Sequence, residues 1–127
     1  MDKQEIYADF RQALIKFKEA LALPAGNDVF KAGCIQYFEF TFELAWKTIK
    51  KIAEEEGISE CNSPKSALKA AFSNRWINEE DVWLDMLTSR NKMSHTYNAT
   101  EALKIFSELP SYAVAFENLE KELGCMV

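Results

Sequence analysis

Hydrophobic residues recur at steps of three and four along most of the chain, which is the spacing of one face of an α-helix. Residues 3–23 follow this pattern and predict a first helix, which the break at residues 24–27 ends. Residues 29–56 predict a second and longer helix with Gly57 as its stop. At 1.5 Å per residue this helix would be about 40 Å long.

Capping residues predict three further helices. Ser63 followed by a proline is typical of an N-cap and first helical position, and it predicts a short helix. Residues 78–81 place acids at a helix start, and Asn98 with Glu101 fits a capping box. We expect Pro110 to kink or divide the last helix. The chain is therefore predicted to be all-α, an up-and-down four-helix bundle with an additional short helix.

The middle of the predicted second helix, residues 34–46, is apolar around most of its circumference. A helix on the surface of a bundle needs only one apolar stripe, so this helix must be covered on two sides. We expect it to lie centrally in the bundle and also to meet a second copy of the protein. Packing in the core and in a homodimer interface explains its aromatic rings better than a cofactor pocket does, and no cofactor is predicted.

Composition limits the classes of function. The 127 residues suit one domain, residues 1–127, with one core. The net charge of −5 gives no support to DNA binding or to non-specific binding of RNA, because such binding needs a basic face. A small local site for an anion remains compatible with it.

Cysteine use and the termini point to one compartment. Cys34, Cys61 and Cys125 are widely separated, lack CxxC spacing and have one histidine to accompany them, so they make a poor metal set. We expect reduced thiols and no metal. The sequence contains no apolar signal core and no run long enough to span a membrane. The predicted location is cytoplasmic, without a membrane partner.

Residues 89–97 contain the candidate chemistry. They hold the only histidine, His95, with Arg90 five residues before it and Tyr97 two after it. Histidine exchanges protons near neutral pH, and arginine binds phosphate oxygens through two donors, so the pair suits metal-independent cleavage of RNA. Positions five apart differ by about 140° around a helix. We therefore expect the helix to end near Met93 so that the two side chains approach each other.

Two readings of this segment stay open. A histidine near a helix end is commonly a partner of the helix dipole or a surface group. Catalysis would need two proton transfers, and one histidine supplies only one at a time. A two-fold dimer that brings both copies of the segment to one cleft would supply two histidines and two arginines.

Four segments in order, residues 33–47, 63–65, 83–87 and 90–97, give the chain a family resemblance. It resembles the nucleotidyltransferase substrate-binding proteins, a branch of the HEPN superfamily. Two departures concern loop shape: Lys65 stands where arginine is common, and residues 75–76, Arg-Trp, stand where a glycine-containing turn is usual.

The resemblance implies a helical bundle that dimerises and forms a complex with a minimal nucleotidyltransferase. It also implies a toxin that cleaves RNA without metal, with Arg90 and His95 as the catalytic pair and Asn91 as the adjacent polar residue. Tyr97 matches the tyrosine to which the partner, acting as antitoxin, attaches AMP. The older family name implies an alternative, a non-catalytic subunit that holds the substrate of the nucleotidyltransferase. A degenerate dimerisation scaffold is a third alternative.

Overall fold

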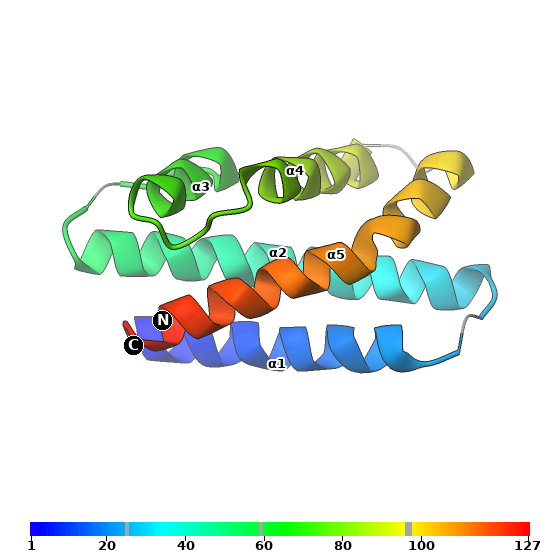
Figure 1. Cartoon of the computed structure of the whole chain (residues 1–127), viewed down its shortest axis with the longest axis horizontal. Coiled ribbons are helices and arrows are strands. Elements are labelled where there is room, and N and C mark those ends of the chain that lie inside the picture. The colour runs from blue at the N-terminus through cyan, green and yellow to red at the C-terminus, as the bar shows by residue number, and fades with distance from the viewer. Residues whose placement is uncertain (25, 59, 96–97) are drawn as a thin grey trace.

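A computed structural model describes residues 1–24, 26–58, 60–95 and 98–127, without the side chains of residues 94 and 95. Throughout these residues the regular structure is helical, as predicted. The five helices, in order, are α1 Lys3–Ala22, α2 Asp28–Glu55, α3 Pro64–Ser73, α4 Glu80–His95 and α5 Ala99–Gly124. Figure 1 shows the long helices alternating in direction, so the predicted up-and-down bundle with a short additional helix is confirmed.

The helices begin where side chains satisfy the free backbone N–H groups of a first turn. Asn27 accepts a hydrogen bond from the amide of Phe30 at 3.0 Å, and Asn98 accepts one from the amide of Glu101 at 3.0 Å. Ser63 forms a complete capping box at the start of α3. The sequence predicts Ser63 and Asn98 as N-caps, and for the second helix either Asn27 or Asp28, of which Asn27 is the cap.

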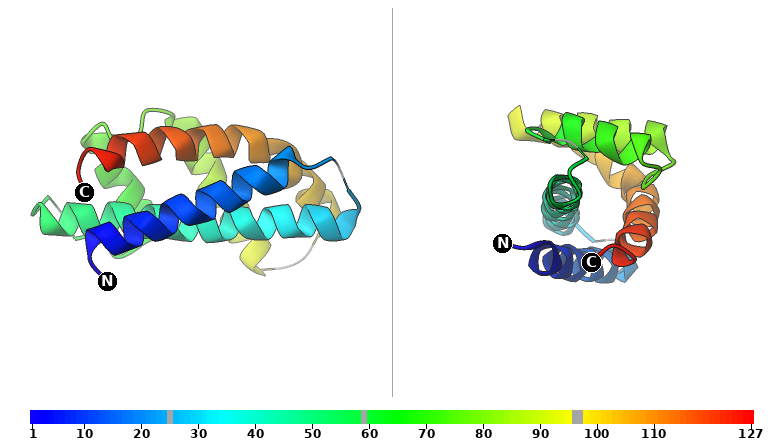
Figure 2. Two further views of the ribbon diagram at one scale, coloured as in Figure 1. Left: turned by 90° about the horizontal axis from the view of Figure 1, so that it is seen from below. Right: turned by 90° about the vertical axis from the view of Figure 1, so that its left-hand side faces the viewer.

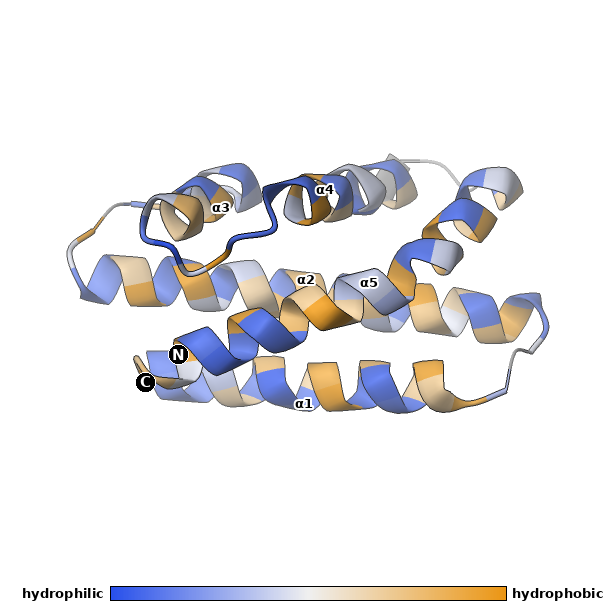
Figure 3. Ribbon diagram, viewed as in Figure 1, coloured by the Kyte–Doolittle hydropathy of each residue, from blue (hydrophilic) through white to orange (hydrophobic). Residues whose placement is uncertain are grey.

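Three long helices enclose most of the core. α2 packs against α1 and α5, and α1 also packs against α5. α3 and α4 lie on the other side of the bundle, and α4 crosses it at a steep angle in the views of Figure 2. Figure 3 shows hydrophilic and hydrophobic residues along every helix, as expected of amphipathic helices around a shared core.

Aromatic rings fill the centre of this core. Phe38 of α2 is fully buried and lies 5.0 Å from the ring of Tyr112 and 6.2 Å from that of Phe116, measured between ring centroids. Trp83 of α4 meets Phe116 edge to face at 5.6 Å. The rings therefore join α2, α4 and α5, the helices that carry the candidate site.

Pro110 lies inside α5, which continues through it as one helix. Figure 1 shows the helix changing direction in its first half. A proline removes one backbone hydrogen bond and crowds the preceding turn, which accounts for a bend. Of the two predicted outcomes, the structure shows a kink and not a division.

The second helix is central, as expected, but one of its sides is not covered by this chain. Positions 29, 33, 37 and 40 follow one side of α2 at steps of four, four and three. Val29 is 79% exposed, Tyr37 38% and Phe40 51%. We call Val29, Gly33, Tyr37 and Phe40 the outer stripe; two of them, Tyr37 and Phe40, belong to residues 34–46, the segment that the sequence predicts to meet a second copy.

Two turns require left-handed backbone. Gly57 ends α2 with φ of 67°, and Arg75 ends the turn after α3 with φ of 62°. The backbone N–H of Trp76 reaches the carbonyl of Ala71 at 2.8 Å, which closes this second turn. The family pattern places a glycine-containing turn here. In this chain Arg75 adopts the left-handed backbone that suits a glycine, so the turn still forms.

Replacing Arg75 with glycine is expected to raise the free energy of unfolding by about 1 kcal/mol, because only glycine adopts left-handed backbone without crowding its Cβ. Gly57→Ala is the matched control, since an added Cβ would meet no atom within 4 Å and the effect comes from φ alone. It should lower stability by a similar amount. Urea unfolding measures both, and an R75G midpoint at or below that of the parent would contradict the expectation.

Candidate functional site

Arg90 lies in the second half of α4 and extends its side chain to α2. Its Nε and Nη2 both donate to Oε1 of Glu43, at 3.0 Å and 2.7 Å. The two side chains are 29% and 32% exposed, so the ion pair is partly withdrawn from water. A half-buried, doubly bonded pair of this kind holds its guanidinium in a defined orientation.

Glu43 is itself held in place. Its second oxygen, Oε2, accepts a hydrogen bond from the indole Nε1 of Trp46 at 3.0 Å, and the Nζ of Lys47 lies 3.9 Å away. The carboxylate therefore has partners on both oxygens before any ligand binds. Because Glu43 cannot rotate without losing them, the position of Arg90 is set by α2 as well as by its own helix.

Asn91, the predicted neighbour of the catalytic arginine, contacts it directly. The Oδ1 of Asn91 accepts a hydrogen bond from Nη1 of Arg90 at 3.1 Å. A carboxylate from α2 and a carboxamide from α4 thus bind different edges of the guanidinium. Asn91 is exposed, so this contact is open to water.

Glu39 stands one turn before Glu43 on α2 and completes the group. Burial raises the pKa of the Glu39 carboxyl, and the charge of Glu43 raises it further, while Arg90 opposes both effects. We call Glu39, Glu43, Trp46, Arg90 and Asn91 the Arg90 cluster. It presents one cation beside two carboxylates, so an incoming phosphate must be recognised by Arg90 against nearby negative charge.

α4 ends later than the sequence predicts. The helix continues to His95 and not only to about Met93, because residues 93–95 contain no glycine or proline and the next N-cap is Asn98. The backbone positions of Arg90 and His95 are therefore about 140° apart around the axis. The side chain of His95 and the whole of Tyr97, the predicted AMP acceptor, lie outside the described residues.

A second network fixes α4 against α5. The hydroxyl of Tyr112 donates to Oδ2 of Asp85 at 2.6 Å, and the hydroxyl of Ser89 donates to the tyrosine oxygen at 2.9 Å. Burial raises the pKa of Tyr112 well above its ordinary value, and the bond to Asp85 adds to the shift. Ser89 directly precedes Arg90, so this network positions the turn from which the arginine projects.

Sequence reasoning missed the partners of Arg90 and of Ser89. Glu43 lies in a segment that is otherwise nearly apolar, and a carboxylate at such a place is the signal that would have singled it out. Tyr112 follows the apolar stripe of α5, so its hydroxyl gave no separate signal. Both pairings join residues far apart in the chain, 47 and 23 positions respectively.

Two surveys of the described parts of the chain bear on the site. Among these residues no group of three or more histidine, cysteine, aspartate or glutamate side chains is arranged to hold a metal ion. Over the same described residues, none of the helices is long and apolar enough to cross a membrane.

The family described as nucleotidyltransferase substrate binding protein like matches residues 5–124, which is nearly the whole chain. The chain belongs to this family. The resemblance inferred from the four sequence segments is thereby confirmed. The match includes α2 and α4, the two helices that build the Arg90 cluster.

Two individual relatives agree with the family assignment. A Haemophilus influenzae protein named "Probable ribonuclease HepT" is 27% identical over 101 residues, covering 76% of this chain and 69% of that protein. A crystal structure of a Thermus thermophilus protein superposes with a TM-score of 0.82 at 33% identity, over 90% of this chain and 98% of the other. The helical-bundle fold is therefore shared with a relative along almost its full length.

Proposed function

We propose that the protein is a metal-independent endoribonuclease of the HEPN type, a toxin that works as a homodimer of a single domain, residues 1–127. The observation that carries this proposal is Arg90, whose guanidinium is held by Glu43 and Asn91 at 2.7 Å and 3.1 Å and lies five residues before the only histidine. The relative named as a ribonuclease supports the same reaction. The catalytic residues are Arg90 and His95, with Asn91 beside them.

The proposed reaction uses the 2′-hydroxyl of RNA as nucleophile. The 2′-oxygen forms a bond to phosphorus while the bond from phosphorus to the 5′-oxygen breaks, which leaves a 2′,3′-cyclic phosphate and a 5′-hydroxyl end. One His95 accepts the proton of the 2′-hydroxyl, and the partner subunit's His95 gives a proton to the departing oxygen. Arg90 offsets the negative charge that builds on the phosphate oxygens.

The outer stripe of α2 supports dimerisation. Phe40 is 51% exposed and Val29 79%, and apolar side chains aligned along one helix face are typical of an interface between chains. Arg90 and His95 lie about 140° apart around α4, and a second copy would allow Arg90 of one chain to approach the partner subunit's His95. The single shared cleft would then combine groups from the α4 helices of both chains instead of two faces of one helix.

Replacing Phe40 with glutamate is expected to convert the dimer to a monomer and to remove RNA cleavage with it. The new charge would lie in an apolar contact, where burial without a partner is strongly unfavourable. Val114→Glu is the matched control, because Val114 is 57% exposed on α5 and lies outside the stripe. Sedimentation equilibrium measures the assembly, and an F40E protein that dimerises like the parent would exclude α2 as the interface.

The proposed regulation acts on Tyr97. A minimal nucleotidyltransferase partner, the antitoxin, would attach AMP to this residue: the phenol oxygen bonds to the α-phosphorus of ATP, the phenol proton is released, and pyrophosphate leaves. The added nucleotide is bulky and negatively charged. Placed two residues from His95, it would block entry of RNA and repel its phosphates. This proposal rests on the family match and on the position of Tyr97 in the sequence.

The decisive experiment incubates the purified protein with RNA in excess EDTA, before and after treatment with the partner nucleotidyltransferase and ATP. We expect cleavage to 2′,3′-cyclic phosphate ends, lost in His95→Ala, and a gain of one or more AMP units in intact mass, lost in Tyr97→Phe. Cleavage by H95A at the parent's rate would overturn the proposed chemistry. AMP transfer to a third molecule, without RNA cleavage, would favour the non-catalytic substrate-binding subunit.

A further inference from the structure

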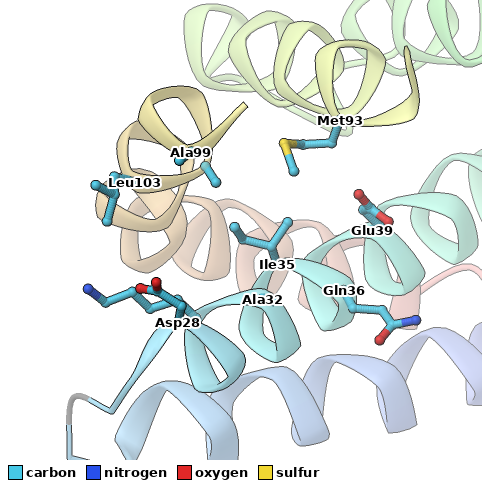
Figure 4. Close-up of a pocket in the computed structure, with 10 residues that line it drawn as sticks. Asp28, Ala32, Ile35, Gln36, Glu39, Met93, Ala99 and Leu103 are labelled. Carbon is cyan, nitrogen blue, oxygen red and sulfur yellow. The ribbon is translucent and has the colours of Figure 1, made fainter. Parts of the chain in front are cut away.

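A cavity of about 270 Å³ lies between the first half of α2, the end of α4 and the start of α5. Figure 4 shows Met93 projecting from α4 toward Ile35 of α2, with Glu39 at one end of the cavity and Asp28 at the other. Pockets for small ligands begin at roughly 300 Å³, so this space suits one flat ring system better than a whole nucleotide.

The cavity is continuous with the Arg90 cluster. Glu39 lines the cavity and also interacts electrostatically with Arg90. Met93 follows Arg90 by three residues, which is one turn of α4 and the same side of the helix. A phosphodiester bound at Arg90 would therefore have an adjoining nucleoside within reach of the cavity.

The charges around the cavity favour a base over a phosphate. Asp28 and Glu39 contribute carboxylates, and Lys31 is the only cation among the described lining residues, with its amine 5.7 Å from the ring of Phe106. A phosphate would be repelled by two carboxylates, whereas the amino group of a base would donate to one. The apolar walls, formed by side chains such as Ile35 and Ala102, suit the faces of an aromatic ring.

We propose that this cavity binds one unpaired base of the RNA beside the scissile phosphate, and that it selects a base with an exocyclic amino group (adenine, cytosine or guanine) over uracil. The carboxylate of Glu39, which points toward α4 in Figure 4, accepts a hydrogen bond from that amino group. Uracil has no amino group and presents carbonyl oxygens to the carboxylate, so it is disfavoured.

This inference rests on the proposed ribonuclease function, and its first test reads selectivity and not rate. A random-sequence RNA is cleaved and the ends are sequenced, with adenine, cytosine or guanine expected about tenfold over uracil at one position next to the cut, the effect of one charge-assisted hydrogen bond. Glu39→Gln should remove most of this preference. Ala102→Leu, which fills the cavity, should do the same, while Ala8→Leu on the exposed face of α1 should retain it.

The second test does not require cleavage. The protein has four methionines, and with 13C-labelled methyl groups the Met93 signal, assigned through Met93→Leu, is followed during titration with 3′-AMP, 3′-CMP and 3′-UMP. A saturable shift with the first two and a weaker one with 3′-UMP supports the inference, even if no RNA is cut and the ribonuclease proposal fails. Cleavage without base preference, or equal responses to all three nucleotides, overturns the inference and leaves the ribonuclease proposal standing. Absence of any Met93 shift also overturns it.

Discussion

Replacing Arg90 with alanine is expected to lower kcat/KM for RNA cleavage by a factor of about 10² to 10³, the usual cost of removing one preorganised group that stabilises transition-state charge. The guanidinium is already oriented by Glu43 at 2.7 Å and by Asn91 at 3.1 Å, so it does not have to be ordered when RNA binds. Arg90→Lys should recover little of the loss. Lysine carries the charge but lacks the planar set of donors that contacts Glu43, Asn91 and a phosphate together.

Replacing Arg90 with alanine should leave the fold nearly intact. The Arg90–Glu43 pair is 29% and 32% exposed, and pairs with this access to water contribute about 1 kcal/mol or less. Glu43 would keep its bond to Trp46. Arg11→Ala is the matched control, since Arg11 of α1 makes a similarly short pair with Glu120 at 3.0 Å and lies outside the site.

The measurement combines initial rates of RNA cleavage with urea unfolding of each variant. The proposal requires a large loss of rate with a small loss of stability in R90A, and no loss of rate in R11A. If R90A unfolds at much lower urea and its rate falls only in proportion, Arg90 is a structural residue. If R90A cleaves RNA as the parent does, the proposed role of Arg90 is wrong.

Most of the fold could be predicted from the sequence because its determinants are local. The N-caps at Asn27, Ser63 and Asn98 act within three residues, and the apolar periodicity of each helix is visible in its own segment. Local signals also predict the left-handed turn at Gly57. Arg75 shows their limit, because an arginine occupies a conformation that its residue type would not predict.

The candidate site could be predicted only in part, because its geometry depends on packing between distant segments. The sequence places Arg90 and Asn91 together, and the structure joins them by a hydrogen bond. It does not identify Glu43, whose pairing with Arg90 depends on how α4 lies over α2. The sequence also predicts too early an end for α4. That prediction required Arg90 and His95 to approach each other within one chain, but no residue near Met93 breaks the helix.

Replacing Tyr112 with phenylalanine is expected to lower the free energy of unfolding by about 1 kcal/mol at neutral pH, since the Ser89 hydroxyl would lose a buried partner. Tyr112 is 1% exposed and Ser89 7%, so water does not readily replace the missing hydroxyl at Ser89, whereas Asp85 is exposed and can be hydrated instead.

The difference in free energy of unfolding between the parent and Y112F should also depend on pH, and it should decrease as the pH rises above about 10. The pKa of Tyr112 is raised in the folded protein, first by burial and then by its bond to Asp85. Near pH 10 the tyrosine of the unfolded chain begins to ionise while the folded one stays neutral, so the stabilisation is complete below about pH 10 and is lost as pH rises above it. The parent should therefore lose up to about 1.4 kcal/mol per pH unit relative to Y112F in that range.

Urea unfolding of the parent and of Y112F between pH 8 and pH 11 measures how the difference between their free energies of unfolding shrinks as the pH rises. Because Y112F lacks only the hydroxyl, ionisation of lysines and of the other tyrosines cancels in the comparison. A gap between the two proteins that stays constant across the range would mean that the Tyr112 hydroxyl reaches water. In that case the hydroxyl would not fix α4 to α5, and the turn that carries Arg90 would have to be positioned by the Trp83–Phe116 ring contact and by Glu43 alone.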